Sequence, residues 1–269
     1  MKDFKGITFH GTFRNYQQKV LDGANKHIQD GKINIVAAPG SGKTILGLEL
    51  IRRLNSPCLI FSPTVTIRDQ WGTRFADFFL DKEQKFEDSF SFNLNKLSLV
   101  TSVTYQALYS AMGKVKCEDD EEVVDYSNID MFKLVIEAGI KTVCLDEAHH
   151  LQNEWQKALE KFIKGLNSEI KIVALTATPP YDANTTEWQR YSSICGEIDE
   201  EIFVPELVKT NTLCPHQDYV YFNYPTDAEI KDFEDYKARA EKAINELIKM
   251  PMFVELGRII KTEINTYYD

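Results

Sequence analysis

The chain has 269 residues, of which 43% are hydrophobic, and its formal net charge at pH 7 is −10. This size and apolar content suffice for one large α/β domain with an appendage, or for two small domains. The acidic balance argues against an extended basic face, by which many proteins hold nucleic acid through lysine and arginine. A polymer held by backbone amides and a few side chains is still allowed.

Neither a membrane protein nor a disulfide-rich secreted protein is indicated. No run of about eighteen apolar residues is present, and the N-terminal segment MKDFKGITFHGTFRN lacks the apolar run of a signal peptide. We therefore expect a cytoplasmic protein that does not enter a membrane. The five cysteines are isolated, with no C-x-x-C pair, which predicts reduced packing residues and no disulfide framework or zinc site.

Short apolar strands alternate with helices over most of the chain. The first helix is expected at 16–29, where apolar residues recur with helical spacing. The alternation that follows is typical of a mostly parallel sheet covered by helices on both faces. The predicted strands are 33–37, 58–61, 97–101, 142–145 and 170–175, and the predicted helices between and after them are 43–54, 66–79, 103–112, 129–138 and 154–163.

The alternation weakens beyond Pro180. Helices are predicted at 187–194 and 205–209, and an added strand at 219–224, where apolar and polar residues alternate. A helical stripe of apolar residues begins at Asp227 and is interrupted at Pro251, after which a second helix is expected.

Three regions follow from this pattern. They are an N-terminal helix region at 1–32, a main α/β domain at 33–225, and a helical appendage at 226–269. The appendage either caps the main domain or leads toward a further part of the protein.

The strongest chemical signal is the segment AAPGSGKT at 37–44, which directly follows a predicted strand and directly precedes a predicted helix. In that context the glycines let backbone amides curl around a β-phosphate, at the positive end of the helix. Lys43 would reach the β and γ oxygens of ATP, and Thr44 would offer its hydroxyl to Mg²⁺. Ala37 stands where the strict pattern has a glycine. The predicted phosphate-binding residues are Pro39, Gly40, Ser41, Gly42, Lys43 and Thr44.

A second signal is the segment VCLDEAH at 143–149, an apolar strand that ends in two carboxylates. A hydrolytic nucleoside triphosphatase needs one carboxylate to hold magnesium and another to orient or deprotonate the attacking water. Asp146 suits the magnesium role and Glu147 the water role. An isolated Asp-Glu pair is usually a solvated turn, so this interpretation depends on the phosphate loop upstream. The predicted catalytic residues are Lys43, Asp146 and Glu147.

Six segments, in order, resemble the motifs of superfamily 2 helicases and translocases over residues 12–180. The pattern is closest to the branch that includes restriction-enzyme motor subunits and XPB-like helicases. The resemblance implies an N-terminal RecA-like P-loop domain that couples ATP hydrolysis to movement on nucleic acid, with DNA favoured over RNA. The segments are RNYQ (14–17), APGSGKT (38–44), SPT through QW (62–71), TSVTYQAL (101–108), DEAH (146–149) and TATP (176–179).

For the adenine end of ATP, the resemblance implies contacts from Arg14 and Gln17. A glutamine amide pairs well with the adenine edge, and a ring from Phe13 or Tyr16 would stack on the base. Taken alone, Gln17 would be interpreted as an exposed helix residue.

The resemblance also implies polymer contacts and coupling residues. Hydroxyls and amides would hold the backbone of a single strand without reading its sequence. Taken alone, Arg68 would be an exposed ion-pair residue and His149 a packing or capping residue at a strand end. The predicted polymer contacts are Thr64, Arg68, Thr101 and Tyr105, and the predicted coupling residues are His149, Thr176 and Thr178.

Members of this family need a second RecA-like domain, whose arginines reach across the nucleotide cleft in a motif resembling Q-x-x-G-R-x-x-R. No such string follows Pro180. The arginines there, Arg190, Arg239 and Arg258, each lie in a helical context typical of the surface. Since an arginine supplied in trans contributes on the order of a thousandfold or more in rate, we expect a half-motor that binds nucleotide and hydrolyses it poorly. The second domain would belong to the same full-length chain.

Two other hypotheses stay open. The chain could be a nucleotide-gated binding or regulatory module that docks on a partner through its C-terminal helices, which the acidic charge and the missing second half favour. It could also be a P-loop NTPase unrelated to helicases, such as an assembly ATPase, although the segments at 62–71 and 101–108 argue against that.

Overall fold

The computed structural model describes residues 3–113, 126, 128–147, 153–166, 169–182, 185–215, 219–221, 223–253 and 255. The chain divides into two units, Met1–Pro215 and His216–Asp269. Each unit is described by itself. Within the described ranges, no helix has the length and apolar character needed to cross a membrane.

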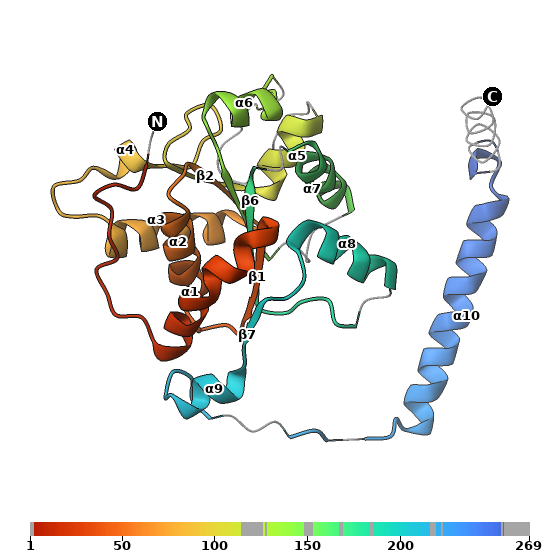
Figure 1. The fold of residues 1–269 in the computed structure, drawn as a ribbon. Coiled ribbons are helices and arrows are strands. Elements are labelled where there is room, and N and C mark those ends of the chain that lie inside the picture. The colour runs from red at the N-terminus through yellow and green to blue at the C-terminus, as the bar shows by residue number, and fades with distance from the viewer. Residues whose placement is uncertain are drawn as a thin grey trace. The chain divides into compact units, whose positions relative to one another are not determined.

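The first unit is built on a seven-stranded sheet in which every pair of neighbouring strands is parallel (Figure 1). The order across the sheet is β3-β4-β2-β5-β6-β1-β7. The strands are β1 (Lys32–Ala37), β2 (Cys58–Ser62), β3 (Phe90–Ser91), β4 (Val100–Thr104), β5 (Thr142–Asp146), β6 (Lys171–Thr176) and β7 (Glu200–Ile202).

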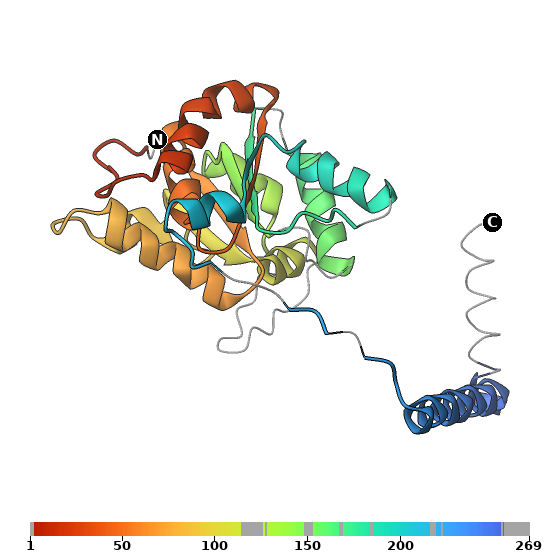
Figure 2. The same ribbon diagram turned by 90° about the horizontal axis from the view of Figure 1, so that it is seen from below.

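Helices cover both faces of this sheet (Figures 1 and 2). Successive residues of a strand point to opposite faces, so on β2 Cys58 and Ile60 pack with α1, α2 and α3, whereas Leu59 and Phe61 pack with α5 to α8. The helices are α1 (Asn15–His27), α2 (Lys43–Leu54), α3 (Val65–Phe79), α4 (Phe86–Ser89), α5 (Tyr105–Gly113), α6 (Met131–Glu137), α7 (Asn153–Gly165), α8 (Thr185–Cys195) and α9 (Val204–Lys209), with a 3₁₀ turn at Ile28–Asp30.

The predicted α/β architecture is confirmed, with differences at short elements. The strand expected at 97–101 is β4, which begins at Val100 and ends at Thr104. The strands β3 and β7 were not predicted, because two or three residues are too few to show a period. The segment expected as a strand at 219–224 forms none among its described residues.

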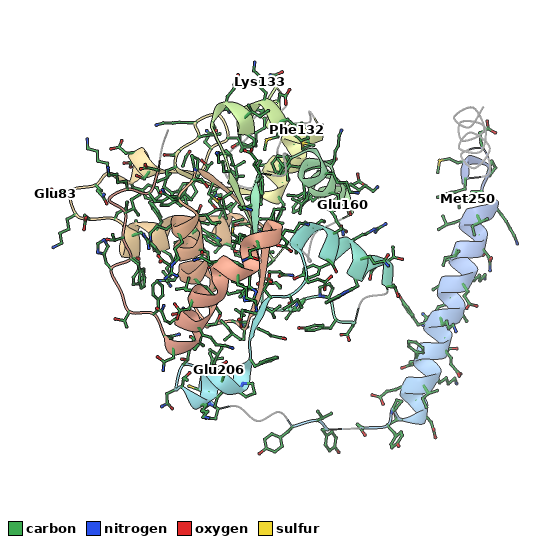
Figure 3. The ribbon with its side chains drawn as sticks, viewed as in Figure 1. Glu83, Phe132, Lys133, Glu160, Glu206 and Met250 are labelled. Carbon is green, nitrogen blue, oxygen red and sulfur yellow. The ribbon has the colours of Figure 1, made fainter. Side chains whose placement is uncertain are left out.

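The second unit contains α10 (Asp227–Lys249). A capping box begins it: Thr226 Oγ1 accepts from the Glu229 amide at 3.3 Å, and Glu229 Oε2 accepts from the Thr226 amide at 2.7 Å. None of the residues of α10 is buried, and their side chains stand out along the helix as far as Met250 (Figure 3). The helix expected after Pro251 lies mostly outside the described residues.

Candidate nucleotide-binding site

Three neighbouring strands bring the predicted chemical groups together. In the sheet β6 lies between β5 and β1, with Asp146 paired with Leu175 and Val36 paired with Thr176. Because these strands are parallel, their carboxyl ends meet at one edge of the sheet, where ligands of open α/β sheets bind. The phosphate loop, the Asp-Glu pair and the TATP segment therefore share one edge.

The phosphate loop adopts the conformation that its glycines allow. Gly40 and Gly42 have φ values of 81° and 85°, in the left-handed region, and Gly42 caps α2. A Cβ atom on Gly42 would lie 2.6 Å from Nε2 of Gln17, so it would displace the end of that side chain. The Ser41 hydroxyl is buried and has no hydrogen-bond partner among the described residues.

The N-terminal helix holds this loop through the Ser41 carbonyl. Tyr16 donates to it from its hydroxyl at 3.1 Å, and Gln17 donates from Nε2 at 3.0 Å. Gln17 Oε1 accepts from the Arg14 amide at 3.0 Å, and Arg14 reaches the Gly40 carbonyl at 3.4 Å. The two contacts of Gln17 use one hydrogen and one lone pair of its side-chain amide, so one of each is left for a ligand.

Glu147 joins the phosphate loop to the TATP segment. Its carboxylate accepts hydrogen bonds from Lys43 Nζ, from Thr176 Oγ1 at 2.6 Å and from the Ala177 amide at 3.1 Å. Burial alone would raise the pKa of Glu147, but the hydrogen bonds from Lys43 and Thr176 outweigh it and hold the pKa below its ordinary value. The residue is thus charged at neutral pH, with a left-handed backbone at φ 53°.

Asp146 is nearly enclosed at the end of β5. Its Oδ2 accepts a 2.8 Å hydrogen bond from the indole Nε1 of Trp71, and its Oδ1 has no hydrogen-bond partner among the described residues. Burial raises the pKa of Asp146 to about 6, against the lowering effects of the Trp71 hydrogen bond and of the Lys43 charge. A carboxylate oxygen of Asp146 and the hydroxyl of Thr44 are hard oxygen donors of the kind that magnesium prefers, so this donor set fits the ion.

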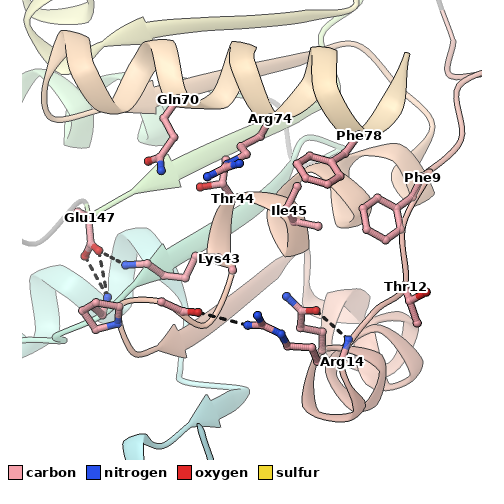
Figure 4. Close-up of a pocket in the computed structure, with 15 residues that line it drawn as sticks. Phe9, Thr12, Arg14, Lys43, Thr44, Ile45, Gln70, Arg74, Phe78 and Glu147 are labelled. Atoms are coloured by element: carbon pink, nitrogen blue, oxygen red, sulfur yellow. Dashed lines mark hydrogen bonds and ion pairs between the residues drawn. The ribbon is translucent and has the colours of Figure 1, made fainter. Parts of the chain in front are cut away.

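A cavity of about 600 Å³ extends from Lys43 and Glu147 to the N-terminal segment (Figure 4). It is large enough for a nucleotide. Figure 4 shows the side chains of Gln70, Arg74 and Phe78 projecting from α3 toward the phosphate loop. The lining residues are Phe9, Thr12, Arg14, Gln17, Pro39, Gly40, Gly42, Lys43, Thr44, Ile45, Gln70, Arg74, Phe78, Glu147 and Ala177.

The aromatic wall of this cavity differs from the expectation. Tyr16 is buried and bonded to the loop, and Phe13 stacks on Phe9 with ring centroids 4.2 Å apart. Phe9 and Phe78 line the cavity instead, and the Arg74 guanidinium lies 5.9 Å from the Phe78 ring centroid. Gln70, Arg74 and Phe78 recur every four residues along α3, a spacing that places them on one helix face and could have revealed them in the sequence.

Residues 10–181, more than half of the chain, match the family described as "Type III restriction enzyme, res subunit". The chain belongs to this family. The predicted N-terminal RecA-like domain of a superfamily 2 helicase is thereby confirmed, as is its restriction-enzyme motor branch. The res-subunit family domain is a helicase-like P-loop ATPase domain. No curated protein matches it by sequence.

Solved structures agree on the fold. The domain is similar to the Hef helicase domain of Pyrococcus furiosus, with a TM-score of 0.53 and 15% identity, over 73% of this chain and 39% of that one. It is also similar to the UvsW helicase of bacteriophage T4, with a TM-score of 0.50 and 15% identity, over 71% of this chain and 60% of that one. The chain thus spans less than two thirds of either protein.

Two of the predicted polymer contacts are corrected by the structure. Thr101 and Tyr105 are both fully buried. Thr101 Oγ1 accepts from the Ser98 amide at 3.0 Å, and the Tyr105 hydroxyl donates to the Asp146 carbonyl at 3.1 Å. These side chains build the core of the res-subunit family domain, and neither reaches a surface where a polymer could lie.

The other predicted contacts lie at the start of α3. Thr64 is exposed and caps the helix, accepting from the Ile67 amide at 3.3 Å. Arg68 donates to the Asp69 carboxylate at 2.8 Å and lies 5.2 Å from the Phe92 ring centroid. Arg68 therefore forms an ion pair, which is the interpretation that its sequence position gave when it was taken alone.

The structure describes two of the three predicted coupling residues, Thr176 and Thr178. Thr176 is buried, contacts Glu147, and accepts at Oγ1 from the Thr178 amide at 3.2 Å. The TATP segment is therefore bonded directly to the predicted water-orienting carboxylate. His149 lies outside the described residues.

Proposed function

We propose that this chain is the ATP-binding first motor domain of a superfamily 2 translocase, which couples ATP hydrolysis to movement on nucleic acid, with DNA favoured over RNA. The observation that carries the proposal is the cavity at the carboxyl edge of the sheet, where Lys43 and Glu147 face each other beside the glycine loop. A cation, a carboxylate and a helix N-terminus at one edge suit the binding and hydrolysis of a nucleoside triphosphate.

Binding of ATP exchanges the partner of Lys43. The Lys43 ammonium is paired with Glu147, and the incoming phosphates would take its place. Release of Lys43 leaves Glu147 held by Thr176 and the Ala177 amide, in a position to orient a water molecule for attack. The hydrogen bonds from Thr176 and the Ala177 amide, which lower the pKa of Glu147, remain after Lys43 is released and favour the deprotonated form that this role needs.

Magnesium, when bound with ATP, would neutralise developing charge on the phosphates. Thr44 and Asp146 are the residues of this chain that would hold it. At the other end of the cavity, Phe9 and Phe78 would enclose the base, and Arg14 and Gln17 would contact its edge.

We propose that a second RecA-like domain completes the motor. The cavity is open to solvent, and the arginines among its lining residues are Arg14, which donates to the Gly40 carbonyl, and Arg74, which lies 5.9 Å from the Phe78 ring centroid. The sequence after Pro180 contains no Q-x-x-G-R-x-x-R string, so the arginine that stabilises the transition state of related enzymes would come from that second domain. On this basis the chain binds ATP and turns it over slowly.

A nucleotide-gated binding module is the second candidate. It is favoured by the exposed apolar side chains of α10, among them Ile230, Phe233 and Ile244. Large exposed apolar residues on one helix are typical of a surface that meets a partner.

The test is the rate of ATP hydrolysis by the full chain alone, with single-stranded DNA and with single-stranded RNA. The half-motor predicts slow turnover that no polymer accelerates. Polymer-stimulated turnover would contradict the half-motor while supporting a self-sufficient translocase. If the chain binds nucleotide but binds no polymer and hydrolyses no ATP, the binding module is favoured.

A further inference from the structure

Trp71 is fully buried in α3, 75 positions before the carboxylate that it contacts. Its Nε1–H is the one side-chain donor to Asp146 among the described residues. The backbone of Asp146 is fixed separately, since its carbonyl accepts from the Tyr105 hydroxyl. Two helices thus hold the end of β5: α5 contacts its main chain through Tyr105, and α3 contacts its carboxylate through Trp71.

The indole is held in place by close packing. Gly47 on α2 faces its ring: a Cβ atom there would lie 2.6 Å from Trp71 Cη2 and 2.6 Å from Leu175 Cδ1. The indole therefore packs closely against α2, the helix that follows the phosphate loop, at a point where Leu175 of β6 also meets that helix. A buried ring in such a site has one orientation, so the direction of its N–H is fixed before any ligand binds.

We propose that Trp71 is a positioning residue that orients the Asp146 carboxylate as a magnesium ligand. The hydrogen bond to Oδ2 fixes the carboxylate plane and leaves Oδ1 for the ion. Hydrogen bonds to a ligating carboxylate commonly tune metal affinity, and their loss costs roughly tenfold to a hundredfold. The inference rests on the proposed function, because it needs Asp146 to be the magnesium ligand.

The same hydrogen bond joins the proposed metal ligand to α3, the helix at whose start two of the predicted polymer contacts lie. Trp71 lies on α3, whose first turn carries Thr64 and Arg68.

The experiment measures ATP affinity of the full chain by calorimetry, in EDTA and over a magnesium titration, for wild type, Trp71→Phe, Asp146→Asn and Trp188→Phe. Trp188→Phe is the matched control, since that indole stacks on Tyr181 outside the cavity. Trp71→Phe is expected to keep the affinity measured in EDTA. The magnesium concentration that produces half of the change in ATP affinity is expected to rise roughly tenfold to a hundredfold in Trp71→Phe. In Asp146→Asn, magnesium is expected to leave the ATP affinity unchanged.

If the magnesium midpoint of ATP affinity is the same in Trp71→Phe as in the wild type, the positioning role of Trp71 is overturned. A magnesium-independent wild type would overturn it too, because Asp146 would then hold no ion. Failure of the wild type to bind ATP under any condition would instead overturn the proposed function. Should Trp71→Phe not fold, replacement of Trp71 by benzothienylalanine keeps the ring shape and removes only the N–H, and the same shift is expected.

Discussion

Lys43 donates a hydrogen bond to the carboxylate of Glu147, although the two residues lie 104 positions apart in the chain. The contact places the two charges that nucleotide hydrolysis needs against each other. On the proposed function, the phosphates of ATP would displace Glu147 from Lys43.

Glu147→Gln should separate binding from turnover. The amide cannot accept a proton, so ATP turnover is expected to fall roughly a hundredfold to ten-thousandfold. Affinity for ATP should be retained or rise, because a neutral amide competes less well for Lys43. Steady-state hydrolysis and calorimetry check the two effects. Unchanged turnover would remove Glu147 from the water-orienting role.

Gln17→Ala tests the two uses of the Gln17 amide. Loss of its hydrogen bond to the Ser41 carbonyl loosens the phosphate loop, so affinity for both ATP and GTP should fall, by roughly threefold to tenfold. A contact with the adenine edge would add a further loss for ATP alone. Equal affinities in wild type and variant would show that neither contact matters for binding.

Phe78→Ala should weaken binding of the base and leave the phosphate end intact. Stacking on an aromatic ring contributes about 1–3 kcal/mol per base, so ATP affinity should fall roughly tenfold or more. Inorganic tripolyphosphate, which has no base, should bind the variant as it binds the wild type. Phe203→Ala, at an exposed phenylalanine outside the cavity, is the control. An equal loss for both ligands would place Phe78 in a purely structural role.

Arg68→Ala should change DNA binding, whereas Tyr105→Phe should change stability. Arg68→Ala should lower affinity for single-stranded DNA and reduce the slope of log affinity against log salt by about 1, as expected for one phosphate contact. Asp69→Asn releases Arg68 from its ion pair and should raise that affinity. Tyr105→Phe should lower the melting temperature and leave DNA affinity unchanged, because its hydroxyl is buried on Asp146. Weakened DNA binding in Tyr105→Phe at unchanged stability would contradict this assignment.

Glu49 should make the fold sensitive to acid. Burial would raise its pKa, but hydrogen bonds from Arg52 and Arg53 outweigh burial and lower the pKa. A folded-state pKa below the unfolded value gives stability above the unfolded pKa that is lost as pH falls through the folded pKa. Glu49→Gln should therefore cost about 2 kcal/mol of unfolding free energy at pH 7 and less in acid. Urea unfolding at pH 7 and pH 4 checks this, and a cost that does not shrink in acid would contradict it.

The features that the sequence predicted correctly are those that depend on local residue patterns. The bounds of α2 were predicted as they are found, because a glycine loop begins the helix and its apolar period is clear. The burial of Thr101 and Tyr105 was not, since every residue of β4 is buried under helices on both faces of the sheet and Tyr105 begins α5, whose packing only the folded chain shows. Phe9 was missed as well, because only the folded chain brings the N-terminal segment to the cavity, and Arg74 was missed although it shares the four-residue spacing of Gln70 and Phe78 on α3.

The central claim is that the glycine loop and Lys43 bind the phosphates of ATP, and the most direct test is equilibrium binding of ATP with magnesium to the full chain. The wild type should bind saturably, and Lys43→Ala should bind roughly tenfold or more weakly, since a charge-assisted contact is lost. Lys82→Ala, at a lysine outside the cavity, should match the wild type. Equal affinities in Lys43→Ala and wild type would contradict the assignment of the site.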